Sequence, residues 1–86
     1  MVYKIEKSVV VYKDGKPSEV FVLWDDDGFS RATCASLNPS FGYTSISASE
    51  GITEALIQRV AREGYYCSEE QKKEHFPTVS VRKWST

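Results

Sequence analysis

The fold is decided by residues 9–37, VVVYKDGKPSEVFVLWDDDGFSRATCASL, in which apolar stretches are separated by turns. The stretches are rich in Val, Phe and other strand-forming residues. They predict three strands, over residues 2–12, 18–24 and 29–37. Asp14 and Gly15 tolerate positive φ and predict a tight first hairpin, whereas residues 25–28 predict a four-residue second turn. This part of the chain therefore predicts a three-stranded antiparallel meander.

A helical pattern follows the meander, after an irregular loop over residues 38–47. Ser47 and Glu50 have the spacing of a capping box, in which each side chain bonds to a free backbone group at a helix start. Apolar residues then recur at helical spacing along one side. We therefore expect an amphipathic helix over residues 48–63, which Gly64 ends in the left-handed conformation.

The last part of the chain predicts a short helix and a strand. Ser68 and Gln71 form a second capping box before residues 69–76, and residues 78–84 have the composition of a closing strand at the edge of the meander. The predicted fold is α+β: an antiparallel meander, one amphipathic helix, a short helical turn and a C-terminal strand. We expect the long helix to pack on one face of a twisted sheet.

Size and charge narrow the classes of protein that this chain can be. A second core would leave about 40 residues per domain, too few to fold without metals or disulfides, so the 86 residues form one domain. The net charge of −1 and the pI of 5.8 argue against broad electrostatic capture of nucleic acid or anionic membrane. No apolar run reaches the length of a membrane span or a signal peptide, so we expect a cytoplasmic protein.

The first hairpin assigns strand residues to two faces of the sheet. If the turn at Asp14 and Gly15 fixes the register, paired residue numbers sum to 29, and Val9 pairs with Val20. The face expected to receive the helix then collects Ile5, Val9, Val11, Val20, Val22, Trp24 and Phe29. The other face is also apolar, since it collects Val10, Tyr12, Phe21 and Leu23, with Ala32 and Cys34 from the third strand.

This second apolar face has two interpretations. It is a minor core closed by the remaining aromatic residues, namely Phe41, Tyr43, Tyr65, Tyr66 and Phe76, or it is a contact surface. We take the contact surface as the hypothesis, formed by Val10, Tyr12, Phe21, Leu23, Phe41 and Tyr43. The sequence then predicts a non-catalytic protein-binding module, acting on a protein target or as a homodimer. Small inhibitors and accessory factors of phages and mobile elements form the class that we expect.

Charged residues add two further candidates. Asp25, Asp26 and Asp27 form an acidic turn that is a secondary partner site, and its spacing does not match a calcium-binding loop. The alternative function is nucleic-acid binding through the sheet and its basic residues. The candidate residues are Lys4, Lys7, Arg31, Arg82, Lys83 and Trp84. Lys4 and Lys7 are expected on opposite faces, because an odd number of positions separates them.

No motif predicts catalysis, a cofactor or a metal site. Cys67 with His75 is the one conceivable nucleophile and base, and neither lies in a motif that positions them. Cys34 and Cys67 are 32 residues apart and lack the close spacing of zinc or redox pairs. We expect two reduced thiols in structural roles, with a disulfide between them as the alternative.

Overall fold

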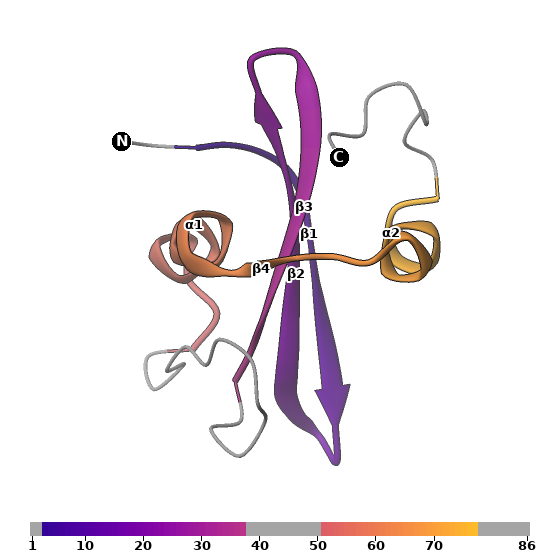
Figure 1. The fold of residues 1–86 in the computed structure, drawn as a ribbon. Coiled ribbons are helices and arrows are strands. Elements are labelled where there is room, and N and C mark those ends of the chain that lie inside the picture. Colours follow the sequence, from indigo (N-terminus) through magenta and orange to yellow (C-terminus); the bar gives the residue numbers. More distant parts are fainter. Residues whose placement is uncertain (1–2, 38–50, 78–86) are drawn as a thin grey trace.

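The computed structural model describes residues 3–37 and 51–77 of the chain. Its sheet has the order β1 (Lys4–Lys13), β2 (Lys16–Asp26), β3 (Phe29–Ser36) and β4 (Tyr65–Tyr66), with every neighbouring pair antiparallel. The helices are α1 (Glu54–Glu63) and α2 (Glu69–His75), and they lie on opposite faces of the sheet (Figure 1). The predicted α+β class and meander are confirmed, while the strand predicted over residues 78–84 lies outside the described residues.

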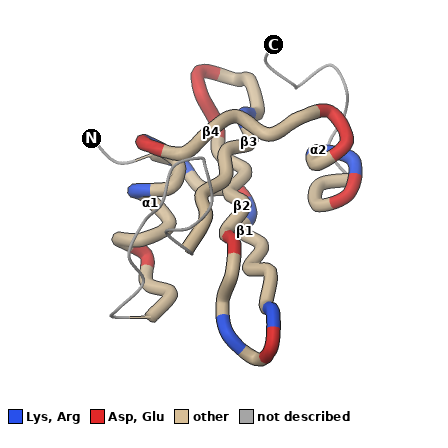
Figure 2. Tube along the Cα trace, turned by 60° about the horizontal axis from the view of Figure 1, so that its bottom comes forward, with Lys and Arg blue, Asp and Glu red and all other residues tan. Residues whose placement is uncertain are grey.

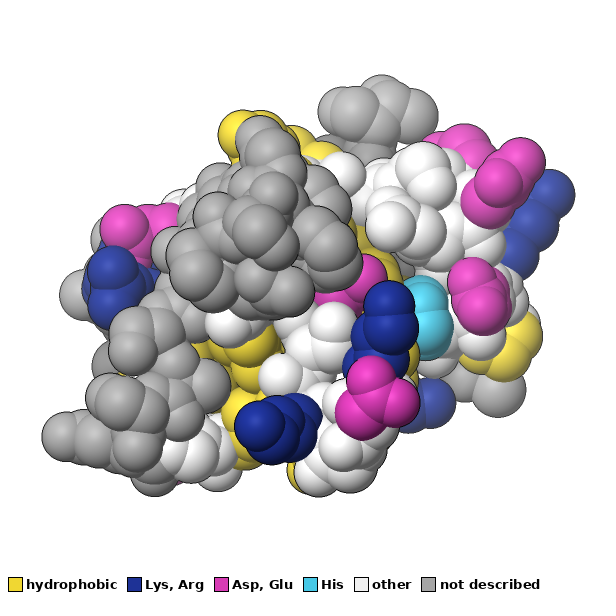
Figure 3. Space-filling model, turned by 90° about the horizontal axis from the view of Figure 1, so that it is seen from below, with side chains coloured by type: hydrophobic (Ala, Val, Ile, Leu, Met, Phe, Trp, Pro, Cys, Tyr) yellow, Lys and Arg dark blue, Asp and Glu magenta, His cyan; other side chains and the backbone are white. Residues whose placement is uncertain are grey.

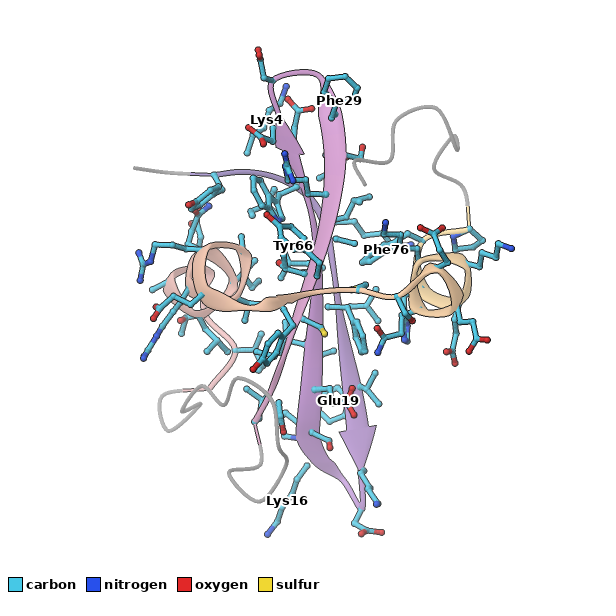
Figure 4. All side chains as sticks on the ribbon, viewed as in Figure 1. Lys4, Lys16, Glu19, Phe29, Tyr66 and Phe76 are labelled. Atoms are coloured by element: carbon cyan, nitrogen blue, oxygen red, sulfur yellow. The ribbon has the colours of Figure 1, made fainter. Side chains whose placement is uncertain are left out.

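Both hairpins of the meander turn on an Asp-Gly pair. Asp14 and Gly15 have φ of 54° and 78°, and Asp27 and Gly28 have φ of 52° and 88°. Two positive φ values in succession define the type I′ turn, whose twist matches that of the strands. The predicted first turn is confirmed, but the predicted four-residue second turn is wrong, because Asp26 is a strand residue paired with Phe29. Phe29 therefore lies at the hairpin tip (Figure 4), 54% exposed instead of in the core.

Two β-bulges change the register that the first turn predicts. Ile5 still pairs with Trp24, but between the bulges the paired residue numbers sum to 30, as for Val10 and Val20. Ser18, beside Pro17, is the extra residue of one bulge and Glu6 is that of the other. Proline cannot donate a ladder hydrogen bond, which explains the irregularity beside it.

A shift of one position moves each side chain to the opposite face. Val9 and Val11 therefore pack on the second apolar face, and Val10 packs on the α1 face. The predicted positions of these three valines are wrong, whereas Ile5, Val20, Val22 and Trp24 lie on the α1 face as expected.

The helix α1 starts later than its predicted first residue. Thr53 is the N-cap, and its hydroxyl accepts a hydrogen bond of 3.2 Å from the Leu56 backbone N–H. Gly51, with φ of 85°, cannot belong to an α-helix. The predicted capping residues Ser47 and Glu50 lie outside the described part of the chain. The short helix α2 has the predicted capping box of Ser68 and Gln71.

Gly64 follows α1 for a reason other than the predicted left-handed conformation. Its φ is −74°, which any residue adopts, so the prediction was wrong. A Cβ atom at this position would lie 2.5 Å from the Val60 carbonyl oxygen and 2.6 Å from that of Cys34. Glycine is required here because the chain passes directly against β3 as it enters β4.

We expect the substitution Gly64→Ala to lower the free energy of unfolding by about 1–3 kcal/mol, because both clashing atoms belong to the backbone. Chemical denaturation of the two proteins measures this difference. Gly15→Ala is the control, since no atom lies within 4 Å of its added Cβ and only its φ of 78° is strained, at a cost of about 1 kcal/mol. A Gly64→Ala protein as stable as the native chain would contradict the close packing of β4 on β3.

Two cores lie on the two faces of the sheet. The first core packs Val20, Val22, Trp24 and Ala35 against Leu56, Val60 and Ala61 of α1. The second core contains Phe21, Leu23, Ala32, Cys34, Cys67 and Phe76, with Val9 and Val11 at its margin. The second apolar face is thus closed within the chain, by the segment from Cys67 to Phe76 that contains α2.

Candidate functional site

The residues predicted as a contact surface are mostly not available for contact. Phe21 and Leu23 are 2% and 3% exposed, and the His75 ring stacks on Phe21 with 4.0 Å between ring centroids. Val10 is half-buried against the first core. The expectation that these residues form one open surface is wrong, because α2 covers the second face. Tyr12 is exposed, while Phe41 and Tyr43 lie outside the described residues.

The acidic turn is divided among three environments. Asp25 lies opposite Lys4 in the register of β1 and β2. Asp26 forms a salt bridge with Arg31, and Asp27 is an exposed turn residue. Within residues 3–37 and 51–77, no three side chains of His, Cys, Asp or Glu gather as metal ligands.

Of the residues proposed for nucleic acid, the structure describes Lys4, Lys7 and Arg31, and acidic residues lie among these three. The bulge at Glu6 places Lys4 and Lys7 on one face, contrary to the prediction, because their partners Asp25 and Leu23 share a face of β2. Acidic and basic positions are interspersed along the sheet and α2 (Figure 2), and charges of both signs are mixed on the face that contains the first hairpin tip (Figure 3). Arg82, Lys83 and Trp84 lie outside the described residues.

Two exposed aromatic side chains lie next to each other at β4. Tyr65 and Tyr66 are 50% and 65% exposed, so they do not close the second face as the minor-core alternative would require. Tyr66 pairs with Thr33 of β3, and the neighbouring Cys67 N–H donates to the Ala32 carbonyl over 2.8 Å. The close passage at Gly64 fixes where this short strand runs.

Arg31 is held beside Tyr66 by both charge and aromatic rings. Its Nε donates to Asp26 Oδ2 over 2.5 Å, and Nη1 donates to the Tyr66 hydroxyl over 3.4 Å. The guanidinium carbon lies 5.7 Å from the centroid of the Tyr66 ring and 6.0 Å from that of Trp24, within cation–π range. The bond to Asp26 raises the pKa of Arg31 above its ordinary value. We call Tyr66, Arg31, Trp24 and Asp26 the Tyr66–Arg31 cluster.

A hollow of about 340 Å³ adjoins this cluster, where the chain leaves β4 for α2. Its lining residues are Arg31, Ala32, Tyr66, Cys67, Ser68, Glu69 and Lys72. Lys72 is largely buried there, and its Nζ lies 3.4 Å from Glu69 Oε1. The hollow thus has two cations and a carboxylate beside an aromatic ring.

The two cysteines meet in the second core. Both are free and 6% exposed. The Cys67 thiol donates a hydrogen bond to the Cys34 sulfur, which lowers the pKa of Cys34, while the same bond and burial raise the pKa of Cys67. Cys67 therefore contacts a second cysteine, and His75, the base considered for it, stacks on Phe21.

Sequence reasoning did not find the Tyr66–Arg31 cluster, although it named Arg31 and Tyr66 separately. Comparison of the chain with protein-family models, with curated proteins and with solved structures finds no match in any of the three. Neither helix of the described residues is long and apolar enough to cross a membrane. The geometry of the described residues is thus the basis for a functional proposal.

Proposed function

We propose that this chain is a non-catalytic protein-binding domain whose contact surface is centred on the Tyr66–Arg31 cluster. The observation that carries the proposal is an exposed tyrosine adjoining an arginine already fixed by a carboxylate and two rings. Tyr and Arg are the residue types that contribute most often to binding energy at protein interfaces. Because the Arg31 side chain is fixed beforehand, a partner binds it without the usual loss of rotamer entropy.

The strand β4 also offers backbone groups to a partner. In an antiparallel pair of strands, residues that hydrogen-bond to the neighbouring strand alternate with residues that do not. Cys67 bonds to Ala32, so the backbone N–H and C=O of Tyr66, the residue before it, point away from β3. An extended segment of another protein can pair with this edge, which is the mode called β-augmentation. The opposite edge strand, β1, is less suited to it, because Lys4, Lys7, Lys13 and a bulge discourage strand pairing.

The partner that this surface fits is therefore a protein with an extended segment, rather than nucleic acid. Arg31 is neutralised by Asp26, and Glu6 and Asp25 lie among the lysines of the sheet. A second copy of the chain is not required to cover an apolar face, since α2 closes that face. The expected roles as an inhibitor or an accessory factor both fit a binding domain of this kind.

The test is site-specific photo-crosslinking in the cells that produce the protein. We expect p-azidophenylalanine in place of Tyr66 to give a discrete adduct with one protein, and the same group in place of Tyr12 to give none. With the identified partner purified, Tyr66→Ala is expected to weaken binding by about 30-fold, the effect of a hot-spot residue, and Tyr12→Ala to leave it unchanged. Tyr12 is a matched control, being a tyrosine that is 61% exposed on the other edge strand. Equal adducts at both positions, or no loss of affinity in Tyr66→Ala, would contradict the proposal.

A further inference from the structure

Cys34 and Cys67 come from distant parts of the sequence but are neighbours on one face of the sheet. Cys34 pairs with Tyr65, and Cys67 follows two positions later on the same strand path, with its N–H bonded to Ala32. Residues two positions apart on one strand share a face, so the two cysteines are diagonal neighbours across β3 and β4. Both thiols lie within the second core.

We propose that Cys34 and Cys67 form a reversible intramolecular disulfide, which fastens β4 to β3 and thereby locks α2 over the second core. Cys67 lies directly before Ser68, the N-cap of α2, so a bond at Cys67 restrains the helix at its first residue. Beyond this point α2 contacts the sheet through the ring of His75 on Phe21 and through Phe76 in the second core. The disulfide closes a loop of more than 30 residues, which lowers the chain entropy of the unfolded state.

The oxidant that fits this site is a small disulfide such as oxidised glutathione. Cys67 lines the hollow beside α2, so a small disulfide can approach the cysteine pair from this side. One cysteine sulfur attacks the glutathione disulfide and releases one glutathione thiol, and the other cysteine sulfur then attacks the mixed disulfide and releases the second. Two cysteine thiols are oxidised, one glutathione disulfide is reduced, and the two cysteine protons end on the two glutathione thiols.

The test is incubation of the folded full-length chain in a glutathione redox buffer, followed by intact mass measurement. We expect the monomer to lose the mass of two hydrogen atoms and to stop reacting with maleimide after unfolding. The variants Cys34→Ala and Cys67→Ala are each expected to keep these two hydrogen atoms, because a single cysteine cannot close the bond. In α2 the Lys72 N–H donates to the Ser68 carbonyl over 3.0 Å, and the Phe76 N–H donates to the Lys72 carbonyl over 2.8 Å. We expect hydrogen exchange at these two amides to slow at least about tenfold on oxidation.

Three results would overturn the proposal. The first is that both cysteines of the folded native chain stay reduced, although the same buffer oxidises a flexible peptide with two thiols. The second is a disulfide that links two chains instead of two residues of one chain. The third is an intramolecular disulfide that leaves exchange in α2 unchanged, since the bond would then not lock the helix.

Discussion

The substitution Leu23→Asp is expected to abolish cooperative folding. Leu23 is 3% exposed in the second core, among Phe21, Ala32 and Phe76. A carboxylate at this position loses its hydration inside an apolar cluster, at a cost of about 4 kcal/mol or more. Small domains have only about 5–15 kcal/mol of stability in total, so the loss is a large part of it. Circular dichroism during thermal and urea unfolding measures the effect.

The control for Leu23→Asp is Tyr12→Asp, which adds the same charge to a residue that is 61% exposed on β1. We expect this variant to unfold within about 0.5 kcal/mol of the native chain. If Leu23→Asp instead stayed folded and only changed its association state, the second face would be a contact surface and its closure by α2 would be refuted.

The substitution Phe76→Ala is expected to release α2 while the rest of the fold persists. Phe76 is 1% exposed and points from the end of α2 toward the sheet (Figure 4). Truncation of a buried phenylalanine costs about 3–5 kcal/mol, and Phe76 is the residue at the end of α2 that belongs to the second core. The first core has no residue from α2, so α1 and the meander retain their packing.

Hydrogen exchange distinguishes this local release from global unfolding. The Lys72 amide, bonded to the Ser68 carbonyl in α2, is expected to lose its protection, whereas the Ile57 amide, bonded to Thr53 in α1, is expected to keep it. Glu70→Ala, a change at an exposed residue of α2, is the control and should leave the protection of both amides unchanged. Equal loss of protection at both amides would show that the two cores unfold as one unit.

The meander and the α+β class could be predicted from sequence because local patterns determine them. An Asp-Gly pair between strand-forming residues specifies a tight turn whatever surrounds it. The positions of Val9, Val10 and Val11 could not be predicted, because three adjacent valines fit either face and a bulge beside Pro17 decides between them. The second turn was predicted too long because three aspartates resemble a loop, although two of them are strand residues.

The candidate site was less predictable, because its residues meet only through tertiary structure. Arg31 and Tyr66 are 35 positions apart, and the contact depends on where β4 joins the sheet. A two-residue strand has no detectable alternation, and its one local signal was Gly64, which was interpreted as a helix stop. The same strand brings Cys67 to Cys34, which their separation in sequence had argued against.

Closure of both faces of the sheet within one chain is tested by the molar mass in solution. Light scattering of the purified 86-residue chain measures this mass over a wide range of concentrations. We predict the monomer mass of 9.7 kDa throughout, because α1 and α2 cover the two apolar faces without a second copy. A stable dimer at low concentration would contradict closure within one chain and would indicate that the second face is an interface between two chains.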